Sequence, residues 1–153
     1  MTARERYNSL FEFYAGRYGL DWRALKAQGI AESNLKADAV SPVGAAGVMQ
    51  FMLPTWIEWH NKIYPGGVVE QRTNPERSIE LGAAYMGWLA SRLGGDQRLA
   101  RAAYNWGIGN VLRHSERTQF RFVLPAAKLP PETQGYLARI DRIYETLFTG
   151  GTS

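Results

Sequence analysis

The segment from residue 74 to residue 95, NPERSIELGAAYMGWLASRLGG, restricts the fold more than any other part of the sequence. Asn74 is a good N-cap, Pro75 suits the first helical position, and Gly94 is typical of a helix end. Apolar residues recur at three- and four-residue steps, the period of one buried helix face: Ile79, Ala83, Met86, Ala90 and Leu93. The segment therefore predicts an amphipathic helix with one face in the core.

Similar signals predict helices along nearly the whole chain. Thr2 is expected to cap a first helix that reaches about Tyr18, with Leu10, Phe13 and Tyr14 inward. Further helices are expected at 22–33 after the cap Asp21, at 55–64, at 97–106 after the cap Asp96, and from 131 onward, the last with an inner stripe of Tyr136, Ile140, Ile143, Tyr144 and Leu147. Strand signals are weak, so we expect a mainly α fold with at most a small β hairpin, within 33–52 or 64–73.

Composition limits the chemistry and the partners. The chain has no cysteine, which excludes disulfides and thiolate metal sites. A formal net charge of +4 favours an anionic partner, such as nucleic acid, a membrane surface or an acidic cell-wall polymer. Charges interrupt the N-terminal segment where a signal peptide needs an apolar core, and no segment approaches the about 18 apolar residues of a membrane helix. We therefore expect synthesis in the cytoplasm and no stable membrane insertion.

Glu32 is the acidic residue that most suggests chemistry. On the helix expected at 22–33, Trp22, Leu25, Gly29 and Glu32 fall within an arc of roughly 80°, which is the apolar face. Burial and the helix C-terminus both disfavour the Glu32 anion, so its pKa should rise toward the range of a general acid. The alternative from periodicity alone is a solvated glutamate at a helix end.

Three motifs in order carry a family resemblance. The "ES" at Glu32 with Ser41 nine positions later, "GAAGVMQFM", and then "AAYNWGIGNV" with "ETQGYLARI" resemble the soluble lytic transglycosylase domain. The resemblance covers about residues 20–145. It implies the goose-type lysozyme fold, a helical bundle around a glycan-binding cleft, and cleavage of peptidoglycan glycan strands. No linker long enough to divide the chain is present, so we expect a single catalytic domain over residues 1–148, with the segment TGGTS at 149–153 as a flexible tail.

The resemblance assigns roles to particular residues. Glu32 matches the sole catalytic acid of the family. The residues that match substrate-binding positions are Ser41, Gln50, Met52, Tyr104, Asn105, Glu132 and Tyr136. Tyr104 matches the tyrosine that hydrogen-bonds near the catalytic carboxylate, and Glu132 matches an acid that binds substrate or steadies the site. Taken singly, each of these residues would more often serve packing or a helix end.

The family chemistry uses one acid and no cofactor. Protonated Glu32 would donate its proton to the glycosidic oxygen between N-acetylmuramic acid and N-acetylglucosamine. As a carboxylate it would then remove the proton of the C6 hydroxyl, which closes a 1,6-anhydro ring without consuming water. Most glycosidases use a second carboxylate, and the nearest in sequence, Asp38, more plausibly stabilises the loop.

Other functions remain open from the sequence. A lysozyme-type hydrolase on the same fold is the closest alternative, and a non-catalytic glycan-binding or structural module is the next. Nucleic-acid binding would require a helical basic stripe of Arg113, Arg117 and Arg121, for which a solvated face is the simpler explanation. His60 and His114 have no metal-ligand spacing, so no metal is expected.

The cellular role is predicted in outline. We expect a monomer that acts on peptidoglycan in the bacterial cell wall and does not bind nucleic acid. Release by a phage as an endolysin is the favoured role, and a virion-associated or secretion-system enzyme is the alternative.

Overall fold

The computed structural model describes residues 5–149. Its elements, in chain order, are α1 (Asn8–Arg17), α2 (Trp22–Ser33), α3 (Leu53–Ile63), α4 (Pro75–Arg92), α5 (Gln97–Trp106), α6 (Ile108–His114), β1 (Glu116–Arg117), β2 (Phe122–Val123), the 3-10 turn η1 (Ala126–Lys128), α7 (Pro131–Tyr144) and the π-helical turn η2 (Glu145–Thr149). The predicted mainly α class is confirmed.

Side-chain caps define the starts of three of the seven α-helices within residues 5–149. The Asp21 carboxylate accepts a hydrogen bond from the backbone N–H of Arg23 at 2.9 Å. Asn74 accepts from the N–H of Arg77 at 3.0 Å, and Asp96 accepts from the N–H of Leu99 at 2.9 Å. Each cap satisfies a backbone donor that would lack a partner inside the helix. The predicted starts of α2, α4 and α5 are therefore confirmed.

The first helix differs from its prediction. It begins at Asn8, after Tyr7 in a left-handed conformation with φ of 64°, and Thr2 lies outside the described residues. Its inner face also differs, because Phe11 is fully buried whereas Phe13 is 63% exposed. Tyr14 is buried as expected. Two positions along a helix turn a side chain by about 200°, so Phe11 and Phe13 point to opposite faces.

The core lies between the faces of the helices. The predicted inner stripe of α4 is confirmed: Ile79, Ala83, Met86, Ala90 and Leu93 are all buried. In the predicted stripe of α7, Ile140 is buried and the others are half-buried. The buried side chains of α1, α2, α4 and α5 join Val48, Met49 and Phe51 of the loop after α2 in a single hydrophobic cluster. The loop is therefore part of the core.

The β hairpin lies later in the chain than predicted. β1 and β2 pair antiparallel, with Glu116 opposite Val123 and Arg117 opposite Phe122. The segment 33–52 contains isolated bridges between Val40, Ala46 and Phe51, and no hairpin. Strands of two residues give no alternating pattern for the sequence to reveal.

The same hairpin removes the basis for a basic helical stripe. Arg113 lies on α6 and Arg117 on β1, while Arg121 precedes β2. The stretch is therefore not one helix, and the helical stripe that nucleic-acid binding would have required is not formed.

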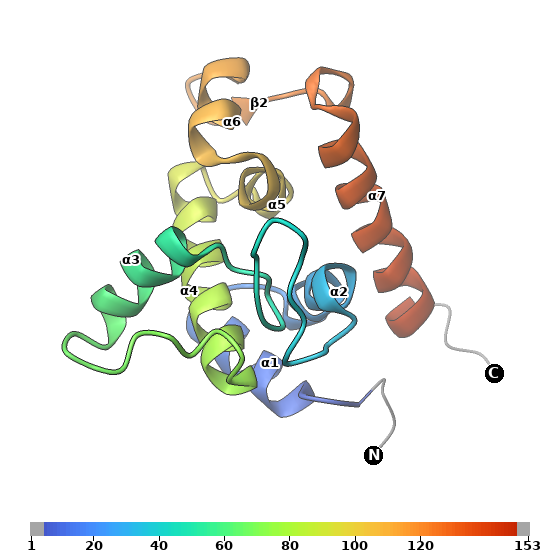
Figure 1. The fold of residues 1–153 in the computed structure, drawn as a ribbon. Helices are drawn as coiled ribbons and strands as arrows, with labels where there is room; N and C mark the ends of the chain where they lie inside the picture. Colours follow the sequence, from blue (N-terminus) through green and yellow to red (C-terminus); the bar gives the residue numbers. More distant parts are fainter. Residues whose placement is uncertain (1–4, 150–153) are drawn as a thin grey trace.

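The helices surround the loop of residues 34–52. Figure 1 shows α7 (red) along one side next to α2, and α3 with α4 on the opposite side. The loop (cyan to teal) runs between them, in front of α4 and below α5. Within residues 5–149, no helix is both long and apolar enough to span a bilayer.

Candidate active site

Glu32 lies in the last turn of α2, and its side chain remains partly accessible to solvent. The Tyr136 hydroxyl on α7 donates a hydrogen bond to Glu32 Oε2 at 2.9 Å. Burial raises the pKa of Glu32 from 4.5 to about 7, although the hydrogen bond from Tyr136 and the positive charge of Arg139 act in the opposite direction. The rise in pKa expected from the sequence is confirmed, with desolvation as its main cause.

Two half-buried phenols lie near this carboxyl group. Burial and then the charge of Glu32 raise the pKa of both Tyr104 and Tyr136 well above 10, so both hydroxyls stay protonated and act as donors. The Tyr104 hydroxyl donates to the backbone oxygen of Met49 at 2.7 Å. The phenol that contacts the carboxylate directly is therefore that of Tyr136, whereas Tyr104 connects α5 to the loop.

The loop after Glu32 is held by its own backbone geometry. Gly47 has φ of 86°, and a Cβ atom there would lie 1.9 Å from the backbone oxygen of Arg72. Only glycine fits both the left-handed conformation and this close approach. The Arg72 guanidinium in turn donates to the backbone oxygens of Gly44 at 2.9 Å and Phe51 at 3.0 Å. Arg72 thus holds the loop at Gly44 and at Phe51.

Ser33 connects the loop to the helix that carries Glu32. Its hydroxyl lies 2.7 Å from the backbone oxygen of Val48 and 3.1 Å from that of Gly29. Val48 and Gly29 are both buried, so their carbonyl groups need a hydrogen-bond donor from the protein. The residue next to the acid therefore fixes the loop against the end of α2.

Two of the predicted sugar-binding residues form hydrogen bonds with backbone groups of the loop itself. Gln50 has φ of 52°, and its side-chain amide donates to the backbone oxygens of Ala39 at 3.1 Å and Gly47 at 2.9 Å. The Ser41 hydroxyl accepts a hydrogen bond from the N–H of Ala45 at 3.0 Å. Both side chains stabilise turns, and their contact with sugar stays a prediction.

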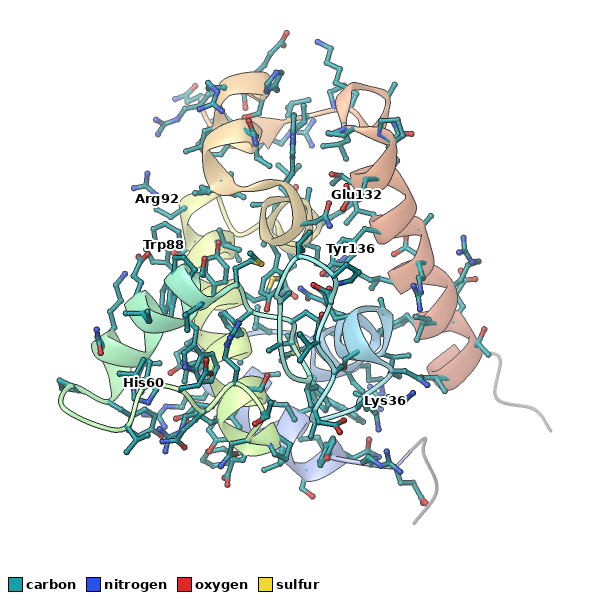
Figure 2. The ribbon with its side chains drawn as sticks, viewed as in Figure 1. Lys36, His60, Trp88, Arg92, Glu132 and Tyr136 are labelled. Carbon is teal, nitrogen blue, oxygen red and sulfur yellow. The ribbon has the colours of Figure 1, made fainter. Side chains whose placement is uncertain are left out.

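The remaining predicted residues come from different elements. Met52 precedes α3 and is 44% exposed. Asn105 on α5 accepts a hydrogen bond from the Thr133 hydroxyl on α7 at 2.8 Å, which joins these two helices. Glu132 is exposed in the first turn of α7. Figure 2 shows Glu132 one turn above Tyr136, both on the side of α7 that faces α5.

Gln28 is a site residue that the sequence analysis missed. It lies one turn before Glu32 on the same helix face and is fully buried. Its amide nitrogen lies 3.6 Å from the Met86 sulfur. Its hydrogen bond to Tyr136 lowers the pKa of that phenol, against the larger upward effects of burial and of the Glu32 charge. Its Oε1 has no hydrogen-bond partner among the described residues. The i, i+4 spacing from Glu32 was the available signal.

Other chemistry finds little support around Glu32. Asp38 is exposed in the loop. Within residues 5–149, no group of three or more His, Asp or Glu side chains is placed to hold a metal ion. A cavity of about 530 Å³ lies between the ends of α2 and α7, with Ile30, Leu35 and Arg142 in its wall, and Glu32 is not part of its lining. The arrangement supports proton transfer by a single carboxyl group.

Comparison with known proteins shows which family has this arrangement. Residues 9–121 match the family model described as the transglycosylase SLT domain. This chain belongs to that family. The match includes Glu32, the loop and Tyr104, but it ends before α7, which carries Glu132 and Tyr136.

Curated relatives of this SLT-domain chain are bacterial proteins. It is 38% identical over 112 residues to membrane-bound lytic murein transglycosylase F of Alteromonas mediterranea, covering 69% of this chain and 22% of that protein. It is also 38% identical over 120 residues to the protein of the same name from Haemophilus influenzae, covering 74% and 23%. The chain thus spans less than a quarter of the length of these relatives.

Solved structures confirm the expected lysozyme-like SLT fold. The 70 kDa soluble lytic transglycosylase of Escherichia coli superimposes with a TM-score of 0.76 at 26% identity, over 92% of this chain and 24% of that one. An inactive Glu-to-Gln mutant of the lytic transglycosylase Slt of Pseudomonas aeruginosa gives a TM-score of 0.68 at 28% identity, over 94% and 22%.

Proposed function

We propose that this SLT-domain chain cleaves the glycan strands of peptidoglycan by lytic transglycosylation, with Glu32 as acid and then base. The observation that carries the proposal is the partly accessible Glu32 carboxyl group whose pKa is about 7, with Tyr136 donating to it. Such a group is populated in both protonation states at neutral pH, which is what a residue that first gives and then takes a proton requires.

The proton transfers balance without a second protein acid. Protonated Glu32 donates to the oxygen between N-acetylmuramic acid and N-acetylglucosamine, and the bond from C1 of the muramoyl residue to that oxygen breaks. The N-acetyl group of the same sugar stabilises the positive charge at C1. The Glu32 carboxylate then takes the proton of the C6 hydroxyl while O6 bonds to C1, which closes the 1,6-anhydro ring and returns Glu32 to its protonated form.

The surroundings of Glu32 suit this single-acid scheme. Burial keeps enough of the acid protonated to start the reaction, and Tyr136 together with Arg139 stabilises the carboxylate formed after the first transfer. Among the described residues, no second carboxylate contributes to the pKa of Glu32. We assign substrate contacts to Met52, Gln50, Ser41, Asn105, Glu132 and Tyr104. The names of the relatives and the inactive Glu-to-Gln mutant of the Pseudomonas enzyme support the scheme.

The decisive experiment is digestion of purified sacculi by the wild-type protein, Glu32→Gln, and Glu12→Gln as a control. Glu12 is an exposed carboxylate on α1. We expect the wild type and Glu12→Gln to release soluble products that end in anhydro-muramic acid. We expect Glu32→Gln to release none. Equal clearance of sacculi by Glu32→Gln and wild type would overturn the assignment of the acid.

Mass spectrometry of the products separates the alternatives. Anhydro ends are lighter than reducing ends by one water, so reducing ends would identify a lysozyme-type hydrolase instead. Binding to sacculi without cleavage would identify a glycan-binding module. The endolysin role, a virion-associated role and monomeric action stay predictions, as does the absence of nucleic-acid binding.

A further inference from the structure

A series of aromatic rings leads from the Glu32 site to the surface of α4. The Tyr104 hydroxyl donates to the backbone oxygen of Met49, and the backbone oxygen of the preceding residue, Val48, binds the hydroxyl of Ser33, so Tyr104 lies near the end of α2 that carries Glu32. The centroid of Tyr85 lies 5.3 Å from that of Tyr104, and Tyr85 and Trp88 are stacked at 6.4 Å with 23° between their planes. Trp59 on α3 completes the group, at 5.4 Å from Tyr85 and 5.8 Å from Trp88.

The last ring of the series is incompletely covered by protein. Trp59 is 7% exposed and serves the core, whereas Tyr85 and Trp88 are half-buried. A large ring left open beside other rings is an apolar surface with a defined plane, and such surfaces commonly bind ligands. The flat C–H face of a hexopyranose matches that shape.

Cations surround the open ring. Lys62 Nζ lies 4.3 Å from the Trp59 centroid and 5.6 Å from that of Trp88, while the guanidinium carbon of Arg92 lies 5.8 Å from Trp88. Lys62 forms an ion pair with Glu58. Arg92 forms no ion pair with a residue of the described part of the chain, so its charge is available to a ligand. The Glu58 carboxylate offsets the charge of Lys62 and helps to raise the pKa of Tyr85 after burial, so Arg92 is the cation that favours an anionic group on a sugar bound at this surface.

The open ring and the Glu32 site lie toward different sides of the molecule. Figure 2 shows Trp88 and Arg92 on the side of α3 and α4, across from Tyr136, whose hydroxyl contacts Glu32. A sugar chain with one linkage at Glu32 can continue in that direction over Tyr85 and Trp88. The cation beside Trp88 would then meet a carboxylate carried by a later sugar unit.

We propose that Tyr85, Trp88, Lys62 and Arg92 form an outer subsite for a sugar residue that carries a carboxylate, such as the lactyl group of N-acetylmuramic acid. The inference rests on the proposed function, since it extends the same glycan site. Trp88 supplies the stacking surface, and Arg92 supplies the charge that distinguishes a muramoyl residue from a neutral N-acetylglucosamine.

The test measures binding without turnover. In the Glu32→Gln background, dissociation constants are determined for peptide-free peptidoglycan strands of several disaccharides, for a single disaccharide, and for a neutral N-acetylglucosamine oligomer of matched length. Trp88→Leu should weaken both long ligands by about tenfold and leave the disaccharide unchanged. Arg92→Gln should weaken the peptidoglycan strand several-fold and leave the neutral oligomer unchanged.

The matched control is Trp22→Leu, because Arg23 lies 5.1 Å from the Trp22 ring as another aromatic–cation pair. Trp22 lies ten positions before Glu32 on α2, about 15 Å along the helix, and should not affect binding. Unchanged affinity of Trp88→Leu and of Arg92→Gln for long strands would overturn the subsite. If Trp88→Leu does not fold, Arg92→Gln alone decides, since its side chain is exposed.

The outcomes separate this inference from the proposed function. If the wild type cleaves sacculi but the Trp88 and Arg92 variants bind long strands as tightly as their parent protein, the subsite is wrong and the proposed reaction stands. Length-dependent binding that requires Trp88, without any cleavage by the wild type, contradicts the proposed reaction and keeps the subsite.

Discussion

The raised pKa of Glu32 predicts how the stability of the protein depends on pH. The folded state holds the Glu32 proton more tightly than the unfolded chain, because the pKa rises from 4.5 to about 7 on folding. At about 1.4 kcal/mol per pH unit, this difference corresponds to roughly 3 kcal/mol of free energy of unfolding. The contribution is fully present below pH 4.5 and is lost as the pH rises through about 7.

Glu32→Gln removes this dependence and retains most of the structure. The glutamine amide is neutral at every pH, and its oxygen can still accept the hydrogen bond from Tyr136. Relative to the wild type, the variant should therefore gain about 3 kcal/mol of stability between pH 4.5 and about 7, with no further gain at higher pH.

Urea-induced unfolding of both proteins, from about pH 4 to about pH 9, measures this difference directly. The exposed Glu12→Gln variant serves as a control and should follow the wild-type curve closely. No substrate is needed, so the result is independent of any enzymatic assay. If the stability curves of the wild type and Glu32→Gln stay parallel across this range, the Glu32 carboxyl group is not desolvated in the folded protein and the reasoning fails.

Two further changes test other parts of the site. Tyr136→Phe removes a hydrogen bond that lowers the pKa of Glu32, so the pKa of Glu32 should rise by about one pH unit. An NMR titration of the Glu32 carboxyl carbon measures this pKa. An unchanged or lower pKa would contradict the assigned contact. Gly47→Ala should cost roughly 3 kcal/mol or more of stability in urea unfolding, because its Cβ would overlap the Arg72 backbone. Gly44→Ala is the matched control, with a similar φ of 92° but open space, and should cost only about 1 kcal/mol.

The starts of α2, α4 and α5 could be predicted because their causes are local. A cap such as Asp21, Asn74 or Asp96 bonds to an amide two or three residues away, so a short sequence window contains both partners. The inner face of α1 could not be predicted in the same way. Whether Phe11 or Phe13 is buried depends on where α2 and α4 lie, which no local pattern states.

In the site, too, the features that depend on neighbouring residues could be predicted from the sequence, and the contacts between distant residues could not. The position of Glu32 on an apolar helix face was visible in the sequence, and burial does raise its pKa. Its direct partner Tyr136 lies 104 residues further along the chain, so the residue patterns alone did not pair the two. Gln50 was predicted as a substrate contact, and the folded loop is needed to show that its side-chain amide donates to the backbone oxygens of Ala39 and Gly47.

The position of α7 has a practical consequence for anyone who trims or transplants this module. The family match stops at residue 121, whereas the phenol opposite the acid comes from Pro131–Tyr144. A recombinant fragment that ends at residue 121 would keep Glu32 but would expose its carboxyl group to bulk water on the side where α7 lies in the full chain. The pKa of Glu32 would then fall back toward that of an ordinary glutamate, and chimeras built from this scaffold should carry the C-terminal helix with them.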